Sequence, residues 1–370
     1  MALKRRIGVL TSGGDCPGLN AVIRGVTQHA TENYDCEVVG IHDGHHGLLA
    51  SPPQTETLSP ALFSGELLRA GGTILGSTTS GDPFAYPMPD GSTCDRSTEI
   101  VDAIAALKLD GLVVIGGDGS MRIFNRLLTS AGVPWVGVPK TIDNDVPGTD
   151  FAVGFFTAVD VVGGALDRLQ STAASHRRIM VLETMGRESG FLALFGGVAG
   201  GADAILIPEM KYDIAELAEH VCRIRSEQRA HVLIAIAEGV PNPRGEIVTL
   251  PYFGSNQAFG GVGTVLADEL GKLIDVSTRC TVLGHLQRGG SPSMFDRLLG
   301  SALSVRAVDA LMNATSPRLA AWRAGQVTDI PMSETITGPR KVDAGSEMLS
   351  VAKGLGVYMG SPRLGENGAR

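Results

Sequence analysis

The sequence has few cysteines, few aromatic residues and no long apolar run. Its five cysteines, at positions 16, 36, 94, 222 and 280, form no CxxC pair, which argues against zinc ribbons and redox dithiols. No run of apolar residues is long enough to cross a membrane, and no signal-peptide pattern follows the basic start of the chain. We therefore expect a cytoplasmic protein whose thiols are reduced.

Positive charge is scarce as well. The chain has 31 lysines and arginines against 39 aspartates and glutamates, a formal net charge of −8. A negative protein has no general attraction for nucleic acid or for an anionic membrane, so we expect neither as a partner. Any anion that it binds has to be held by local groups.

Glycine and apolar residues, by contrast, are abundant. The 370 residues include 49 glycines, and 43% of the chain is hydrophobic, although only 5% is aromatic. This length is sufficient for two domains with large cores. Many glycines with few aromatic residues are typical of α/β proteins with tight turns between strands and helices.

Short apolar runs alternate with helical patterns along most of the chain, as in the helical repeat of residues 155–170. Apolar runs without alternation indicate parallel strands covered on both faces. We predict an α/β protein of two doubly wound Rossmann-like domains with mainly parallel sheets. Residues 78–97 look like a loop, and residues 313–350 have little pattern. The predicted strands are 7–10, 38–41, 111–115, 135–138, 179–183, 204–207, 232–238 and 280–285.

Ligands of such folds bind beyond the carboxyl ends of the strands. In the first half, Gly13 and Gly14 follow one strand, and the sequence GGDGS follows another. Glycines there allow backbone N–H groups to approach a phosphate. Asp118 within the second turn would repel a phosphate unless a cation lay between them, which predicts Mg²⁺. Either turn alone would equally fit a purely structural role.

The predicted strands of the second half are flanked by arginines and hydrogen-bonding groups, among them Arg177 and Glu238. Arginine matches phosphate oxygens bidentately, and a glutamate suits a sugar hydroxyl. A single arginine is more often just a solvated surface residue. Together the two halves suggest a polyphosphate donor and a phosphorylated acceptor. The stretch GVPKTIDND, residues 137–145, belongs to the first half and carries Lys140, Asp143 and Asp145 directly after a strand.

These motifs resemble the phosphofructokinase family, whose members phosphorylate fructose 6-phosphate at its 1-hydroxyl. The matching segments run in family order from about residue 7 to residue 310: GVLTSGGDCPGLNAVIRG, GGTILGS, VVIGGDGS, PKTIDND, GFFTA, SHRRI, ETMGR, AIAEG and TVLGHLQRGGSPSMFDR. The sequence after residue 312 matches weakly. The resemblance implies a kinase that uses ATP or pyrophosphate with Mg²⁺.

The resemblance also implies roles for individual residues. Asp143 matches the general base, Asp145 the residue that supports it and the metal, and Thr141 a residue at the transferred phosphoryl group. Asp118 matches the metal-linked carboxylate. The donor loops correspond to Gly14, Thr79, Gly117, Asp118, Gly119 and Ser120; the acceptor pocket corresponds to Thr141, Asp143, Arg178, Met185, Gly186, Arg187, Glu238, Arg279, His285 and Arg288.

The sequence departs from the family pattern in ways that bear on the donor. Gly119 resembles ATP-dependent members, in which a side chain would crowd the nucleotide, whereas Lys140 is typical of pyrophosphate-dependent members. The combination resembles an actinobacterial-like subgroup that uses ATP. Thr79 stands where an arginine commonly bridges the two phosphates, and Lys140 is a candidate for supplying that charge. Arg187 and Lys140 are the candidates for stabilising negative charge as the phosphoryl group moves. Of the basic residues expected at the bacterial effector site, Arg24 is present, but Gln28 replaces an arginine.

The resemblance further implies a homo-oligomer, a dimer or a tetramer, in which Arg178 and Arg279 reach the site of a neighbouring subunit. We expect a donor domain of residues 1–153 plus about 275–312, an acceptor domain of 154–274 plus about 313–370, and the active site in the cleft between them. Alternatives are a pyrophosphate-dependent enzyme, a paralogue acting on sedoheptulose 7-phosphate, an inactive regulatory relative, and an NAD or lipid kinase with a similar GGDG signature. The intact Asp118 and Asp143 argue against an inactive relative.

Overall fold

The computed structural model describes residues 4–63, 65–227, 229–251 and 257–362. The chain divides into two compact units. The first unit consists of residues 1–157 and 288–339, and the second of residues 158–287 and 340–370. No helix among the described residues is both long and apolar enough to cross a membrane.

A seven-stranded sheet in the order β16-β15-β7-β6-β1-β2-β3 forms the centre of the first unit. The five strands from β15 to β2 are parallel, and the edge strands β3 and β16 are antiparallel to their neighbours. Every residue of β6 and β7 is buried, which explains why the sequence shows no alternation there. The strands are β1 (Arg6–Thr11), β2 (Glu37–Ile41), β3 (Thr55–Leu58), β6 (Gly111–Gly116), β7 (Trp135–Pro139), β15 (Arg318–Arg323) and β16 (Gln326–Pro331).

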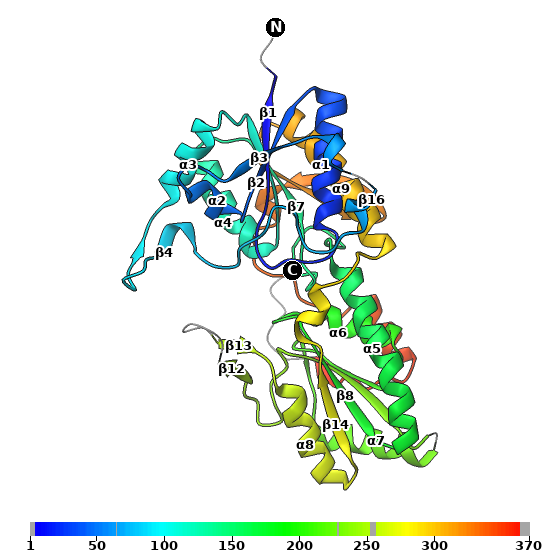
Figure 1. Cartoon of the computed structure of the whole chain (residues 1–370). Helices are drawn as coiled ribbons and strands as arrows, with labels where there is room; N and C mark the ends of the chain where they lie inside the picture. Colours follow the sequence, from blue (N-terminus) through cyan, green and yellow to red (C-terminus); the bar gives the residue numbers. More distant parts are fainter. Residues whose placement is uncertain (1–3, 64, 228, 252–256, 363–370) are drawn as a thin grey trace. The chain divides into compact units, whose positions relative to one another are not determined.

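Helices cover both faces of this sheet. The paired helices α1 and α9 lie on one face, and α2, α3 and α4 lie on the other (Figure 1). The loop predicted at residues 78–97 contains only two short strands and one 3₁₀ turn before α3 begins. The helices are α1 (Leu19–Tyr34), α2 (His45–Leu49), α3 (Ser97–Ala106), α4 (Asp118–Ser130) and α9 (Met294–Asn313); the short elements are β4 (Tyr86–Pro87), β5 (Thr93–Cys94), η1 (Pro60–Leu62), η2 (Leu67–Arg69), η3 (Pro83–Ala85) and η5 (Met332–Glu334).

The second unit contains a four-stranded parallel sheet in the order β14-β8-β11-β9. Helix α6 packs on β9 and β11, while α7 and α8 pack together over β11, β8 and β14. The elements are α5 (Phe155–His176), β8 (Ile179–Thr184), α6 (Phe191–Ala199), β9 (Ala204–Leu206), β10 (Met210–Lys211), α7 (Ile214–Glu227), β11 (Val232–Ala237), β12 (Thr249–Pro251), β13 (Gln257–Phe259), α8 (Val262–Ile274), β14 (Thr278–Val282), η4 (Gly284–Arg288), α10 (Glu347–Gly354) and β17 (Ser361–Pro362).

The predicted α/β class with mainly parallel sheets is confirmed, but two segments belong to other units than expected. Residues 275–287 lie in the second unit because β14 pairs with β8. Residues 313–339 lie in the first unit because β15 pairs with β7 and turns back into β16. The segment that showed little pattern therefore supplies the edge of the first sheet.

Candidate active site

Two turns at the carboxyl ends of neighbouring strands carry the predicted donor residues of the first unit. β1 and β6 are adjacent and parallel, so the turns that follow them lie side by side. Ser12 donates its backbone N–H to the carbonyl of Ile115, with N and O 2.9 Å apart. Ser120 Oγ donates to Ser12 Oγ over 3.0 Å. The two turns are thus tied together by backbone and hydroxyl contacts.

Gly13 and Gly14, the two glycines of the first turn, are required for different structural reasons. Gly13 has a φ of +85°, which favours glycine, and its N–H donates to the carbonyl of Thr78 over 2.8 Å. The Gly13 N–H is therefore already bonded within the protein, so the predicted phosphate contacts of this turn would come from its other N–H groups. A Cβ atom on Gly14 would lie 2.7 Å from Nη1 of Arg288, so a glycine there lets Arg288 approach the backbone.

Arg288 belongs to the first unit and lies against the donor loop. Its Nη1 donates to the carbonyl oxygen of Asp15 over 3.1 Å. The resemblance grouped Arg288 with acceptor residues of the second half, whereas the structure brings it to Gly14 and Asp15. The protein as a whole is negatively charged. The Arg288 guanidinium adds local positive charge to the loop that follows β1.

Thr79 lies in a segment that packs along the same loop. Ser77 Oγ donates to the carbonyl of Gly13 over 2.5 Å, and Thr78 accepts the Gly13 N–H. Thr79 follows directly and is exposed. The position where the family commonly has an arginine is therefore next to the donor loop and carries no charge here.

The second turn leads into helix α4. Gly117 is the residue before the helix, and Asp118 is its first residue. The four N–H groups at the start of a helix, together with its dipole, favour a negative ligand. A Cβ atom on Gly117 would lie 3.4 Å from the carbonyl oxygen of Lys140, so this turn packs closely against the segment that follows β7.

Among the described residues, nothing requires position 119 to be a glycine. Gly119 is the second residue of α4, its φ is not in the left-handed region, and a Cβ atom there would meet none of the described atoms within 4 Å. A glycine in a helix costs roughly 1 kcal/mol of stability relative to alanine. The exposed side of Gly119 is therefore free of protein packing among the described residues and leaves room for a ligand.

Asp118 fits a magnesium ligand. It is 6% exposed, its Oδ2 pairs with Arg122 over 2.8 Å, and its Oδ1 has no partner among the described residues. Burial raises the pKa of Asp118, the Arg122 guanidinium lowers it, and the nearby Asp145 carboxylate raises it further. The described residues hold no cluster of three metal-ligating side chains. The unpartnered Oδ1 of Asp118 fits Mg²⁺, which proteins often hold by one or two carboxylates together with substrate phosphates.

The TIDND segment after β7 is fixed by its own side chains. Asn144 has a φ of +52°, a left-handed conformation that asparagine tolerates. Its Nδ2 donates to the carbonyl of Asp150 over 3.0 Å, and its Oδ1 accepts the N–H of Ala152 over 2.9 Å. Thr141 Oγ1 accepts the N–H of Asp143 over 3.0 Å. The buried Asp143 is thus held on a rigid loop.

Lys140 links this segment to the first donor loop. It is 2% exposed, and its Nζ donates to the carbonyl of Gly14. A Cβ atom on Gly13 would lie 3.3 Å from this Nζ. Burial lowers the pKa of Lys140 from its ordinary value, while the nearby Asp143 raises it. The ammonium group therefore lies in the donor loop, within the same unit as Asp118 and Asp143.

In the second unit, three predicted acceptor residues follow β8 and one follows β11. Gly186 has a φ of +138°, and a Cβ atom there would lie 2.6 Å from the carbonyl oxygen of Ser189. The N–H of Arg187 donates to Oε1 of Glu238 over 3.1 Å. The N–H of Glu238 donates to the carbonyl of Thr184 over 2.8 Å. The Glu238 carboxylate thus holds the backbone of the Met185–Arg187 turn. The Arg187 side chain takes no part in this contact and is exposed.

The other predicted acceptor residues of this unit divide between the two edges of the sheet. His285 is exposed and follows the carboxyl end of β14. Arg178 precedes β8, and Arg279 is the second residue of β14, paired with Met180. These two arginines lie at the amino edge of the sheet, whereas Met185–Arg187 lie beyond its carboxyl edge. The six residues of β8 span about 20 Å, which separates the two groups within one chain.

Two residues that shape the site were not singled out by the sequence. Asn144 was hidden between the two aspartates, although an asparagine is a common residue at positive φ. Asp296 is fully buried and accepts the N–H groups of Gly154 and Thr157, at 2.9 Å and 2.7 Å. It fixes the chain beside Val153, whose carbonyl oxygen accepts the N–H of Thr141. Only the FDR motif signalled its importance.

The doubly wound units, the paired glycine turns and the acidic segment after β7 define a phosphoryl-transfer enzyme of the α/β class. A family model described as "Phosphofructokinase" matches residues 6–311. The chain belongs to the phosphofructokinase family, as its motifs predicted.

The chain is similar over its whole length to curated relatives. It is 48% identical over 360 residues to ATP-dependent 6-phosphofructokinase 1 of Nostoc sp., covering 97% of this chain and 100% of the relative. It is 44% identical over 358 residues to ATP-dependent 6-phosphofructokinase 1 of Synechocystis sp., covering 96% and 99%. It is 43% identical over 357 residues to the ATP-dependent 6-phosphofructokinase of Chloroflexus aurantiacus, covering 96% and 98%.

Solved structures share the fold. The Saccharomyces cerevisiae phosphofructokinase aligns with a TM-score of 0.76 and 30% identity, over 90% of this chain and 45% of the yeast chain. The chain thus spans less than half of that larger protein. A pyrophosphate-dependent phosphofructokinase from Marinobacter aquaeolei aligns with a TM-score of 0.76 over 98% of this chain and 94% of that chain, but at 19% identity this likeness concerns the fold alone.

Proposed function

We propose that this protein is an ATP-dependent 6-phosphofructokinase, which converts fructose 6-phosphate and ATP to fructose 1,6-bisphosphate and ADP. The observation that carries the proposal is the full-length similarity, at 43–48% identity, to three relatives that are all named ATP-dependent 6-phosphofructokinase. The relatives described are from cyanobacteria and Chloroflexus, so the actinobacterial-like subgroup stays a prediction. The proposed location of this glycolytic kinase is the cytoplasm.

In the proposed reaction, the 1-hydroxyl oxygen of fructose 6-phosphate bonds to the γ-phosphorus of ATP while the bond to the β–γ bridging oxygen breaks. Asp143 takes the hydroxyl proton, and its position on the loop held by Asn144 supports this role. The two glycine turns bind the donor phosphates through N–H groups and the start of α4. Mg²⁺, held by Asp118 with support from Asp145, would neutralise charge on the phosphates.

Lys140 and Arg288 are the proposed cations of the donor side. Both donate to carbonyl groups of the loop that carries Gly14 and Asp15. Because Thr79 next to this loop is uncharged, Lys140 is the group best situated to replace the arginine that the family commonly has there. On the acceptor side, we assign Met185, Gly186, Arg187, Glu238 and His285 to fructose 6-phosphate.

A pyrophosphate-dependent enzyme is the second candidate, because Lys140 is typical of that class. The open space beside Gly119 favours ATP instead, since a ligand larger than pyrophosphate needs room next to the phosphate loop. No feature of the described residues favours sedoheptulose 7-phosphate as the acceptor.

Gly119→Ala separates a ligand role of this glycine from a structural one. The variant should unfold at a higher temperature, because alanine stabilises a helix by up to about 1 kcal/mol relative to glycine. Its KM for ATP should rise, because the new methyl group occupies ligand space. Thermal unfolding without ligand and steady-state kinetics measure the two effects. Gly164→Ala in α5, where a Cβ atom also meets none of the described atoms within 4 Å, should stabilise the protein without changing the KM.

If Gly119→Ala leaves the KM for ATP unchanged, the space beside Gly119 is not used by the donor. The assignment of ATP then loses its structural support, although the proposal of a 6-phosphofructokinase does not.

We propose a homo-oligomer in which Arg178 and Arg279 act at the site of another copy. Their position at the amino edge of the second sheet, away from Met185–Arg187, supports this. The helix α9 also exposes an apolar stripe, with Met294 at 83% exposure and Leu298 one turn further on. Exposed apolar stripes of this kind are typical of protein interfaces.

Mixed oligomers test the shared site. Arg279→Ala and Asp143→Ser should each be nearly inactive alone. When co-expressed and co-purified, the two variants should regain roughly a quarter of the wild-type activity, because some sites combine an intact Asp143 with an intact Arg279 from the other copy. Activity no greater than that of the two variants measured separately would show that each chain completes its own site.

A further inference from the structure

Asp296, the third residue of α9, is a carboxylate that is fully buried. Its Oδ1 accepts the N–H of Gly154 over 2.9 Å. Its Oδ2 accepts the N–H and the hydroxyl of Thr157, over 2.7 Å and 2.5 Å. Ser293 Oγ donates to the same oxygen over 3.3 Å. A buried charge destabilises a fold unless hydrogen bonds satisfy it, and these four bonds hold the Asp296 carboxylate in one place.

Thr157 and Ser293 complete the contacts around this carboxylate. The Thr157 hydroxyl donates to Asp296 and accepts the N–H of Ser293 over 2.9 Å. The Ser293 hydroxyl accepts the N–H of Asp296 over 3.1 Å, which caps helix α9. We call Asp296, Thr157 and Ser293 the Asp296 cluster. This cluster joins the start of α9 to Gly154 and to the start of α5.

Val153, the residue before Gly154, holds the backbone on both sides of Lys140. The N–H of Val153 donates to the carbonyl of Pro139 over 3.0 Å, and its carbonyl accepts the N–H of Thr141 over 3.1 Å. Lys140 thereby forms a parallel β-bridge with Val153. The main chain at Lys140 therefore takes its position from Val153.

The first donor turn packs against the same two residues, Val153 and Gly154. Cys16 Sγ donates to the carbonyl of Val153 over 3.3 Å. Gly154 has a φ of +100°, and a Cβ atom there would collide with Cys16 Sγ. A Cβ atom on Gly18 would lie 2.6 Å from Cγ1 of Val153 and 3.6 Å from the Cβ atom of Asp296. Interiors packed this closely transmit small shifts, so a movement at Asp296 also displaces the donor turn.

Lys140 contacts both parts of this arrangement. Its main chain pairs with Val153, and its Nζ donates to the carbonyl of Gly14 in the donor turn. Val153 and the adjoining Gly154, which Asp296 holds, contact the backbone of Lys140 as well as the donor turn. The position of the ammonium group is therefore set by Asp296 through these two intervening residues.

We propose that Asp296 is a positioning residue for phosphoryl transfer, because the Asp296 cluster sets the ammonium group of Lys140 against the donor turn. This inference rests on the proposed function, in which Lys140 stabilises negative charge on the transferred phosphoryl group. Asp296 itself takes no part in the chemistry. A displacement of about 1 Å at a reaction centre can lower a rate by about a hundredfold, so the loss of this contact is measurable.

A double-mutant cycle in turnover tests the proposal. Asp296→Asn keeps the side chain's volume and replaces one acceptor oxygen by an amide group. It should lower turnover with ATP by roughly tenfold to a hundredfold, with little change in the KM for fructose 6-phosphate. In the Lys140→Met variant, the same substitution should cost less than about threefold, because the group that Asp296 positions is gone. Equal fold losses in the two backgrounds would overturn the proposal.

Thr157 supplies a second pair of variants, which also serves if Asp296→Asn does not fold. Thr157→Val keeps the shape of the side chain but removes the hydroxyl bonds to Asp296 and Ser293. Thr157→Ser keeps both bonds. Turnover should fall roughly tenfold in the valine variant and stay within about twofold of wild type in the serine variant. Equal turnover of the two variants would contradict a role for these bonds.

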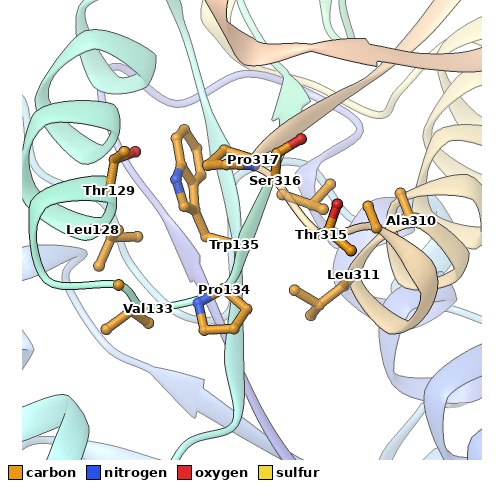
Figure 2. Close-up of a pocket in the computed structure, with 13 residues that line it drawn as sticks. Leu128, Thr129, Val133, Pro134, Trp135, Ala310, Leu311, Thr315, Ser316 and Pro317 are labelled. Carbon is orange, nitrogen blue, oxygen red and sulfur yellow. The ribbon is translucent and has the colours of Figure 1, made fainter.

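Leu311→Ala, near the other end of α9, is the structural control. Figure 2 shows Leu311 in the lining of a pocket that also contains Pro134 and Trp135. Trp135 begins β7, whereas Lys140 follows the last residue of that strand. The variant should unfold at a lower temperature because it enlarges this pocket, yet its turnover should stay close to that of the wild type. A loss of turnover as large as that of Asp296→Asn would mean that any destabilisation of α9 slows the enzyme.

Amide hydrogen exchange tests the positioning without any turnover. In Asp296→Asn, the amides of residues 141–145 should exchange faster than in wild type, because the Val153 carbonyl that accepts the Thr141 N–H is held less firmly. Amides of β8 in the second unit should exchange as before. Unchanged exchange at residues 141–145 would overturn the proposal. A wild type that is inactive with ATP would refute the proposed function instead, and exchange would still decide whether Asp296 holds the segment of Lys140.

Discussion

Asp143→Ser should lower turnover by about a thousandfold, because it removes the proposed general base, a contribution that is typically 10²- to 10⁴-fold. The KM for fructose 6-phosphate should change little. Asp143 is buried on a loop held by Thr141 and Asn144, so a smaller side chain leaves the loop's hydrogen bonds in place. Steady-state kinetics with saturating ATP and Mg²⁺ measures both quantities.

Asp143→Asn is the matched variant, since it keeps the shape of the side chain and removes only its basicity. It should lose as much turnover as Asp143→Ser. A loss of only a few-fold in either variant would remove Asp143 as the base. Asn144→Ala is the structural control: it releases the loop at Asp150 and Ala152, so turnover and thermal stability should fall together.

Lys140→Ala should lower turnover by roughly a hundredfold, the size of effect seen when one preorganised charge or donor is removed from a reaction centre. The physical reason is that the ammonium group of Lys140 is buried against the donor loop at Gly14. Thr79, which lies next to the same loop, carries no positive charge. The loss should appear with ATP as the donor and should exceed any change in the KM for fructose 6-phosphate.

Lys140→Met separates charge from packing, because methionine fills most of the lysine's volume without its charge. It should unfold closer to the wild-type temperature than Lys140→Ala, yet be equally slow. Near-normal turnover of Lys140→Met would mean that Lys140 only holds the loop at Gly14, and that the missing arginine has no replacement.

The central strands could be predicted from the sequence because they are buried on both faces. All residues of β6, β8 and β11 are buried; β6 and β11 are unbroken apolar runs, and β8 begins with one, Ile179–Leu182. The edge hairpin of β15 and β16 was not predicted, because its strands are half-exposed and mix polar with apolar residues. β14 starts at Thr278, two residues before the predicted strand of residues 280–285. Its start was missed because the exposed Arg279 interrupts the apolar pattern.

The sequence indicated which segments belong to the candidate site but not which residues in them contact one another. The motifs singled out the two glycine turns and the TIDND segment because their glycines and carboxylates directly follow buried strands, and the structure brings these segments together in the first unit. They did not indicate that Thr78 occupies the Gly13 N–H, or that Arg288 lies against Gly14. These contacts join segments far apart in the sequence, and only the folded chain brings them together.

One assay tests the central claim most directly: initial rates of the purified protein with fructose 6-phosphate and Mg²⁺, supplied in parallel with ATP or with pyrophosphate. We predict formation of fructose 1,6-bisphosphate with ATP and little or none with pyrophosphate. Turnover with pyrophosphate alone would contradict the assignment of ATP, and no product with either donor would contradict the proposed kinase activity.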